Sequence, residues 1–399
     1  MTTASQKTLP FGEFVALMAL TISLVALSID AMLPALPDIG RELGVARANN
    51  NQLIISLLML GLSIGQMIYG PLSDSTGRKP AVYVGFGIFI GGCVMSLLAT
   101  SFPVMLAGRI LQGVGVAGPR IVAVAVVRDQ YEGRAMAQVM SFIMAVFILV
   151  PIIAPALGQG LLQVAHWRAI FGAFLLLAII ALAWFSIRQP ETLPSERRRP
   201  FSVQRILGAI REILFNRVAF GYTIAAGLVS GAFLGYLSSA QQIFGEIYHL
   251  GARFPLFFAI LALSIGSASF FNGRLVMRYG MRALTGWAIR TLSGLAAICL
   301  ILFWLLAGGQ PPLWLFMGYM LLTFFCVGVL FGNLNALAME PLGHIAGVGA
   351  AVVGSLSTLI SVFLGTLVGQ AFNGTVLPLV GGFAVLGAAA IVTMYWVER

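Results

Sequence analysis

Residues 53–100 read LIISLLMLGLSIGQMIYG, then PLSDSTGRKP, then AVYVGFGIFIGGCVMSLLAT. The two apolar runs are each close to the length of about 20 residues that a helix needs to cross a bilayer. The segment between them is short and polar, and it carries Asp74, Arg78 and Lys79. This pattern predicts two antiparallel membrane-spanning helices joined by a charged loop.

The composition extends this interpretation to the whole chain. Of the 399 residues, 59% are hydrophobic and 9% are charged, and the mean hydropathy is +0.98. An average soluble protein has about 25% charged residues, so this chain has too little polar surface to cover a soluble globule. The composition excludes a cytosolic enzyme and predicts an all-α membrane protein surrounded by the lipid bilayer.

Apolar runs separated by short polar segments predict twelve transmembrane helices. A polar stretch, 188–216, divides the chain into a six-helix bundle at 1–187 and a second six-helix bundle at 217–399. Within 201–214 apolar residues recur at helical spacing, which favours an amphipathic helix on the inner leaflet; a solvated linker is the alternative. The expected helix limits are 12–36, 49–70, 81–100, 104–127, 137–163, 168–187, 217–243, 254–272, 283–307, 313–337, 345–372 and 376–396.

The two halves resemble each other at an offset of 203 residues. Gly70 and Gly77 are seven residues apart in the first half, and Gly273 and Gly280 have the same spacing in the second. A parallel six-plus-six repeat is typical of transporters whose substrate site lies between the halves near the membrane midplane.

The net charge of +10 is distributed unevenly. Most of the 23 Lys and Arg residues fall in one set of loops, which makes those loops and both chain ends cytoplasmic. The charge therefore indicates topology and not a nucleic-acid partner. The Cys and His residues are scattered without metal-ligand or catalytic spacing, and no Walker A string is present. We expect no metal, no cofactor and no catalytic residues.

Asp30, Arg109, Arg120 and Arg290 fall inside apolar runs, where charges are costly. A rise of 1.5 Å per residue places Asp30 about 24 Å and Arg109 about 28 Å above the cytoplasmic helix ends. We expect these two to pair, with Pro34 breaking the helix beside the acid. Protonation of Asp30 would release Arg109, which makes the pair a proton-coupling site; a fixed structural ion pair is the alternative. Arg120 could line the cavity or reach the interface, and Arg290 lacks an apparent acidic partner.

Residues 70–80 resemble the signature loop between helices 2 and 3 of the major facilitator superfamily. This resemblance implies the superfamily's fold, with twelve transmembrane helices in two six-helix pseudo-repeats. It also implies that the loop latches the halves on the cytoplasmic side, with Asp74 engaging the arginine that ends helix 4, Arg128. The sequence departs from the common pattern at Ser75, where the family often has a basic residue. The gating residues are Gly70, Asp74, Gly77, Arg78, Lys79 and Arg128.

Three further strings narrow the resemblance. The end of the first helix is similar to that of the Bcr/CflA drug-resistance transporters. The fourth helix resembles the motif associated with proton coupling in proton-linked members, and the fifth resembles the antiporter motif, with departures at Ala154 and Gln159. The strings are Asp30-x-x-Leu33-Pro34-x-Leu36-Pro37, Arg109-x-x-Gln112-Gly113 and Pro151-x-x-x-Pro155-x-x-Gly158-x-Gly160.

We expect a wide apolar substrate cavity between the halves. Soft and aromatic side chains tolerate varied substrates, although ordinary helix packing also explains such stripes. The candidates are Gln112 on the fourth helix, Met140, Met144 and Phe147 on the fifth, and Phe233 and Tyr236 on the seventh.

With these resemblances, the sequence predicts a monomeric transporter of the bacterial inner membrane. It would export small hydrophobic compounds in exchange for protons, with the proton gradient as its energy source. A proton-coupled transporter of one specific metabolite and a non-transporting receptor on the same fold are alternatives. A membrane-embedded enzyme is a third, which the absence of a catalytic cluster disfavours.

Overall fold

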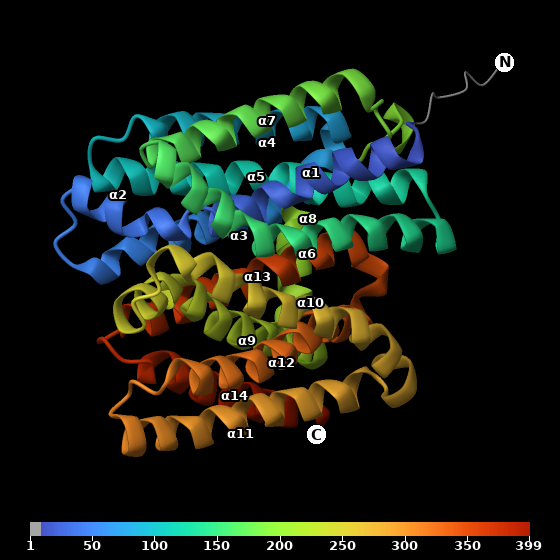
Figure 1. Ribbon diagram of the computed structural model, residues 1–399. Helices are drawn as coiled ribbons and strands as arrows, with labels where there is room; N and C mark the ends of the chain where they lie inside the picture. The colour runs from blue at the N-terminus through green and yellow to red at the C-terminus, as the bar shows by residue number, and fades with distance from the viewer. Residues whose placement is uncertain (1–8) are drawn as a thin grey trace.

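The computed structural model describes residues 9–399, so the first eight residues of the expected N-terminal bundle lie outside the described part. Helices run side by side in two stacked groups, α1–α7 and α9–α14 (Figure 1). Eleven helical segments of the described chain are long and apolar enough to cross a membrane, and the segment Leu313–Gln370 contains two long helices. The expected twelve transmembrane helices are therefore confirmed.

The first group supplies six crossings. In the first crossing, a short 3₁₀ turn, η1 (Leu33–Ala35), joins α1 to α2. A second 3₁₀ turn, η2 (Ala48–Gln52), precedes α3. The helices are α1 (Phe11–Asp30), α2 (Leu36–Glu42), α3 (Leu53–Thr76), α4 (Arg78–Leu97), α5 (Phe102–Gln130), α6 (Gly133–Val164) and α7 (Arg168–Arg188).

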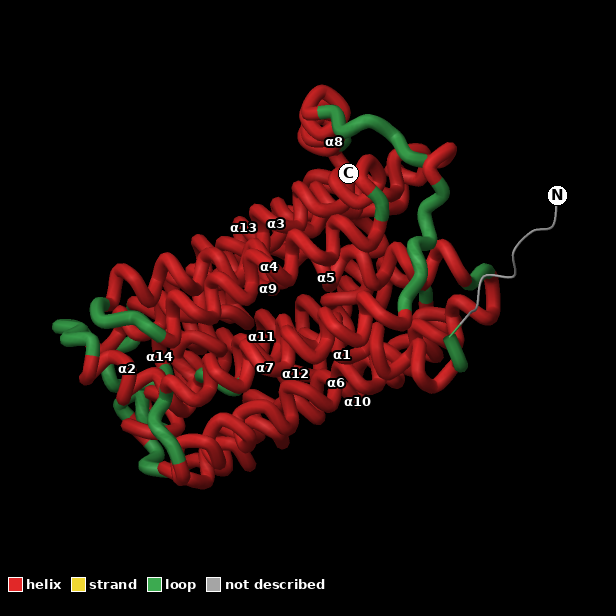
Figure 2. Tube along the Cα trace, turned by 90° about the horizontal axis from the view of Figure 1, so that it is seen from above, coloured by secondary structure: helices red, strands yellow, loops and turns green. Residues whose placement is uncertain are grey.

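The second group supplies the other six crossings. It contacts the first group mainly through α3 against α13 and α6 against α10. Figure 2 shows the molecule as all helix and loop, with α8 standing apart from the main body. The helices are α9 (Arg217–Gln242), α10 (Phe254–Tyr279), α11 (Met281–Ala307), α12 (Leu313–Met339), α13 (Ala346–Gln370) and α14 (Leu377–Glu398).

The connection between the groups contains α8 (Val203–Phe215), where the sequence predicts an amphipathic helix. Ile206, Ala209 and Ile213 are buried on one side of it. An adjacent apolar strip that includes Leu207 and Phe215 is exposed. The helix is thus present, and its place on a membrane leaflet stays a prediction, as do the bundle boundaries.

The segment 70–80 is mostly helix, and the expected loop is wrong for most of its length. Helix α3 continues through Pro71 to Thr76, and α4 begins at Arg78. The hydroxyls of Ser73 and Thr76 donate to carbonyls one turn back, which suits short polar side chains inside a helix. Gly77 alone makes the break, with a φ of 105° that favours glycine.

Candidate functional site

The acid Asp30 lies at an interruption of the first membrane crossing. Helix α1 ends at Asp30, and Pro34 has no N–H with which to continue the helical ladder past that point. The Asp30 residue is 4% exposed. Among the described residues its carboxylate has no ion-pair partner. The interruption beside the acid thus forms where the sequence predicts it.

The direct pairing of Asp30 with Arg109 is wrong. Arg109 is fully buried, and its Nη2 donates to the Ser28 carbonyl at 2.7 Å while its Nε donates to the Ile54 carbonyl at 2.9 Å. The last carbonyls of a helix have no partner within the helix, and Ser28 is two residues from the end of α1. The guanidinium therefore binds the backbone that carries Asp30, and not its carboxylate.

Gln112 holds Arg109 in this position. Its Oε1 accepts a hydrogen bond from Arg109 Nη1 at 2.6 Å, and its Nε2 donates to the Gly92 carbonyl and the Ser96 hydroxyl. Gln112 is fully buried. It links α5 to α4, so its assignment to the cavity lining is wrong, because no part of its side chain is open.

Helix α6 closes on the interruption beside Asp30 through Gly158. A Cβ at Gly158 would lie 2.9 Å from the carbonyl carbon of Ala31 and closer still to its oxygen. Glycine is therefore required for this close approach. A Cβ at Gly160 would meet nothing within 4 Å, so of the two glycines in this motif only Gly158 lies in a close helix contact. Both Pro151 and Pro155 lie inside α6.

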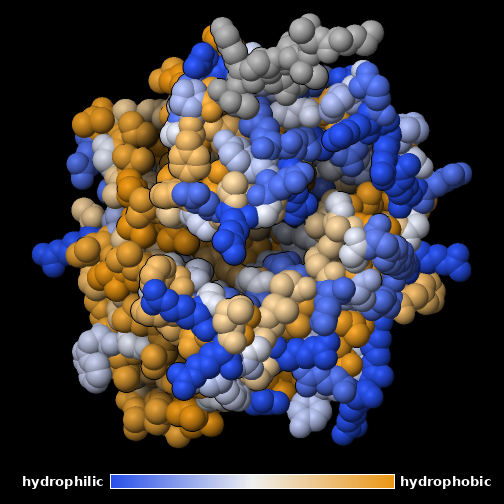
Figure 3. All heavy atoms as spheres, turned by 90° about the vertical axis from the view of Figure 1, so that its right-hand side faces the viewer, coloured by the Kyte–Doolittle hydropathy of each residue, from blue (hydrophilic) through white to orange (hydrophobic). Residues whose placement is uncertain are grey.

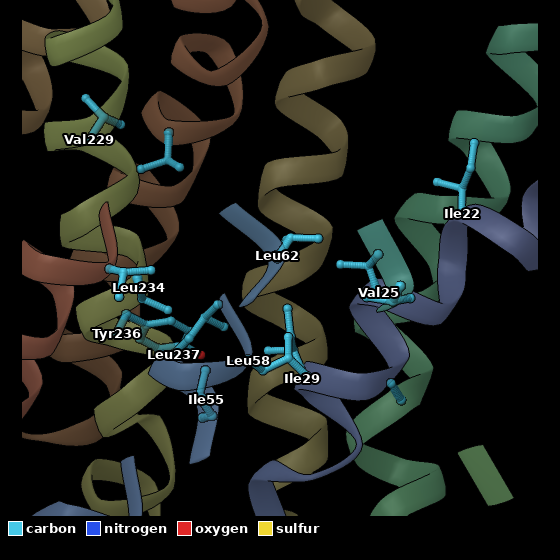
Figure 4. Close-up of a cluster of buried hydrophobic side chains, with 14 of the residues drawn as sticks. Ile22, Val25, Ile29, Ile55, Leu58, Leu62, Val229, Leu234, Tyr236 and Leu237 are labelled. Atoms are coloured by element: carbon cyan, nitrogen blue, oxygen red, sulfur yellow. The ribbon is translucent and has the colours of Figure 1, made fainter. Parts of the chain in front are cut away.

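An apolar cluster spans the two groups next to Asp30. Figure 4 shows Ile29 of α1 beside Ile55 and Leu58 of α3, facing Tyr236 and Leu237 of α9. The Tyr236 hydroxyl is buried and has no hydrogen-bond partner among the described residues. The seventh crossing thus meets the first crossing at the level of the acid.

Phe233 and Tyr236 belong to an aromatic cluster that the sequence reveals only in part. The Tyr236 ring lies 4.7 Å from the Phe324 ring and 5.9 Å from the Phe258 ring, between centroids. Phe331 packs edge-on against Phe233 at 5.4 Å. The three added rings come from α10 and α12, and no spacing within one sequence could indicate which helices meet.

The candidate cavity residues on α6 separate. Met140 and Phe147 are half-buried against the apolar core, whereas the Met144 residue is 41% exposed. The same helix meets the second group where Ile148 packs on Gly266 of α10. Among the described residues, no ring contact joins Phe147 to the aromatic cluster.

Arg78 is the centre of an ion-pair cluster at the junction of α3 and α4. Its guanidinium contacts Asp74 at 2.7 Å and Asp129 at 2.8 Å, and its side chain is only 9% exposed. The expected contact between Asp74 and Arg128 is therefore wrong. The residue of α5 in the cluster is the neighbouring acid, Asp129, and both acids contact Arg78. Since Asp74 turns to Arg78, the residue that ties the end of α5 to the junction is Asp129. We call the end of the molecule that carries this cluster the latch end.

The start of the connection to α8 completes the cluster. The Glu191 carboxylate accepts hydrogen bonds from the backbone N–H groups of Arg78 and Lys79 at 2.8 and 3.0 Å. A carboxylate at a helix N-terminus satisfies free N–H groups and complements the helix dipole. Lys79 Nζ donates to the Ser186 carbonyl, and the Thr192 hydroxyl donates to Asp129.

Side-chain amides close the opposite end, which we call the amide end. Asn49 of η2 donates to the carbonyls of Gln370 and Phe372 at 2.9 and 2.8 Å. Gln242 of α9 donates to Asn49 at 2.9 Å and accepts from Gln52 at 2.6 Å. These bonds join the two groups. Figure 3 looks onto the latch end, where hydrophilic side chains gather and the surface is hollowed at its centre.

Arg120 lies on nearly the same side of α5 as Arg109, eleven residues along the helix. That side faces away from Leu111, which is exposed on the outer surface. Arg120 is half-buried, and among the described residues it forms no ion pair.

A family model described as Major Facilitator Superfamily matches residues 18–366. The chain is 30% identical to an uncharacterized MFS-type transporter, YdgK, of Bacillus subtilis, over 86% of this chain and 85% of the relative. It is 28% identical to a bicyclomycin resistance protein homolog of Haemophilus influenzae, over 96% and 94%. It is also 28% identical to multidrug resistance protein D of Escherichia coli, over 89% of each chain.

Solved structures agree on the fold. The xylose transporter XylE from E. coli, in a partially occluded inward open conformation, superposes with a TM-score of 0.74 at 12% identity, over 96% of this chain and 97% of that one. The human organic anion transporter MFSD10 gives 0.70 at 18% identity, over 98% and 100%. The chain belongs to the major facilitator superfamily. It is a multi-pass membrane transporter and not an enzyme.

Proposed function

We propose that this transporter exports small hydrophobic compounds in exchange for protons. The names of the bicyclomycin and multidrug resistance relatives support this substrate class. The aromatic cluster around Phe233 and Tyr236 supports it as well, because aromatic and apolar surfaces bind varied compounds without fixed polar geometry. We place the protein as a monomer in the bacterial inner membrane, with the latch end and both termini in the cytoplasm.

The observation that carries the proposal is the buried acid at the interruption of α1. A carboxylate without a cation partner is costly to bury, whereas its protonated form is not. Water that reaches Asp30 from one side of the membrane would allow it to release a proton. Arg109 would respond through the α1 backbone, because its Nη2 holds the Ser28 carbonyl.

The difference between the two ends of the molecule supports an alternating-access mechanism. In this structure the amides of Asn49 and Gln242 hold the groups together at the amide end, while the latch end is hollowed at its centre. We infer that the outward-open state breaks the amide contacts. Gly70, which faces Ala351 of α13 across the groups, and the cluster around Asp74 and Arg78 would then close the latch end.

The test is proton release from the purified protein in weakly buffered detergent. Chloramphenicol and a panel of unrelated hydrophobic drugs are added at pH 7, and the wild type is expected to release protons with several of them. Drug binding without proton release would favour a receptor. If no drug releases protons but one metabolite does, the protein would be a transporter specific for that metabolite.

Arg120 is the observation that favours the metabolite alternative. An unpaired guanidinium facing the interior would bind a carboxylate or phosphate group on a substrate. On that alternative, Arg120→Gln weakens transport of acidic compounds alone, whereas on the drug-export proposal the neutral and acidic compounds are affected alike.

A further inference from the structure

We propose that a pocket between α11 and α14 binds the headgroup of one anionic phospholipid. The pocket has a volume of about 520 Å³. It lies apart from the Asp30 region and from the aromatic cluster, and no step of the proposed export cycle uses it. The residues that line it include Arg282, Gly286, Trp287, Arg290, Tyr395 and Glu398.

Arg290 is placed in the pocket by a glycine one turn before it. A Cβ at Gly286 would lie 3.3 Å from Arg290 Nη1 and 3.9 Å from its central carbon. The guanidinium thus lies back over Gly286, toward the start of α11 at Met281. Arg290 begins about 13 Å into the helix, and folding back brings its charge to the headgroup level, as long basic side chains do in membranes.

The charges of the pocket leave Arg290 unmatched. Arg282 already contacts Glu340 at 3.0 Å, and Glu398 accepts a hydrogen bond from the Tyr222 hydroxyl at 3.5 Å. Arg290 is exposed, and among the described residues it forms no ion pair. Because Glu340 pairs with Arg282, Arg290 is the cation of the lining that has no acidic partner among the described residues. A phosphodiester that carries one negative charge, as in phosphatidylglycerol, matches it.

Two exposed aromatic residues line the pocket. Trp287 on α11 and Tyr395 on α14 are both about half exposed. Trp and Tyr are enriched where a membrane meets water, because each ring has an apolar body and a polar edge. A bound lipid would therefore place its phosphate at Arg290 and its glycerol and upper acyl chains against these rings.

The experiment is native mass spectrometry of the detergent-purified full chain with phosphatidylglycerol, phosphatidylethanolamine or phosphatidylcholine. The wild type is expected to retain one phosphatidylglycerol in preference to the two zwitterionic lipids. Arg290→Gln should weaken that retention about tenfold, as expected for the loss of a charged hydrogen-bond partner. Arg134→Gln, which removes an exposed arginine from α6 in the other group, should leave it unchanged.

A second variant removes a negative charge from the pocket and should therefore have the opposite effect on lipid binding. Glu398→Gln removes the only negative charge of the lining and keeps the size of the side chain. It should strengthen phosphatidylglycerol retention severalfold. Equal retention of all three lipids by the wild type would overturn the proposal. So would an Arg290→Gln protein that retains phosphatidylglycerol like the wild type, or a Glu398→Gln protein that retains it less.

Discussion

Replacing Gly158 by alanine perturbs the acid site without touching a charged residue. The added methyl would sit 2.9 Å from the carbonyl carbon of Ala31, and real Cβ atoms essentially never approach another heavy atom closer than 3.0 Å. Because its oxygen is closer still, α6 and the α1 interruption must separate by about 1 Å. Overpacking of this kind costs about 1–3 kcal/mol, which shifts a two-state equilibrium roughly 5- to 150-fold.

The shift should appear in transport because Ala31 follows Asp30 directly in the chain. We expect Gly158→Ala to lower proton-gradient-driven transport in proteoliposomes at least about fivefold. Gly160→Ala is the matched control, since a Cβ there meets nothing within 4 Å, and it should transport like the wild type. Equal transport and equal thermal unfolding midpoints for the two variants would refute this reasoning.

Three further predictions concern the latch end, the aromatic cluster and the amide end. Asp129→Asn should slow turnover, because it takes one carboxylate from the mostly buried Arg78 guanidinium at a cost of about 1.5–3 kcal/mol. Arg128→Gln should not slow it, and equal stopped-flow rates for the two variants would count against a role for Asp129 at the latch end. Phe233→Ala should alter the order of drugs in a susceptibility panel in an efflux-deficient host, and a uniform loss would remove this ring from the substrate site. Asn49→Ala should increase alkylation of cysteines placed at the amide end, because it removes hydrogen bonds across the groups; Asn50→Ala is the control, and no difference between them would show that these bonds do not hold that end closed.

The number and order of the membrane crossings could be predicted from the sequence, because each crossing needs a segment of a certain length and hydropathy. The twelve crossings follow from apolar runs, and the interruption of the first crossing follows from one proline. The extension of α3 to Thr76 could not be predicted, because Gly70 and Pro71 are typical of turns, whereas in the fold the helix continues through both.

The partners of charged groups were predicted less well. Depth along two helices indicates that Asp30 and Arg109 lie near one another, but it contains no information on rotation or side-chain direction. The sequence therefore could not show that the Ser28 carbonyl, and not the Asp30 carboxylate, accepts the hydrogen bond from the Arg109 guanidinium. Glu191 was missed for a related reason, because a helix-capping acid more than one hundred residues from its helix has no local signal.

The surroundings of Arg290 could be predicted only in part from the sequence. Its lack of an acidic partner is visible in the sequence, and the Gly286 contact and the facing wall of α14 are visible only in the fold. The same holds for Arg120, whose spacing from Arg109 indicates a shared face, while its lack of an ion-pair partner comes from the structure.

The most direct test of the account is proton-gradient-driven drug transport by Asp30→Asn in proteoliposomes, beside the wild type. The substitution keeps the size of the side chain and removes its ability to change charge. We expect the variant still to bind neutral drugs in detergent but to transport them at the rate of protein-free liposomes, with no response to the pH gradient. Wild-type transport that still follows the pH gradient would contradict the assignment of Asp30 as the proton-coupling residue.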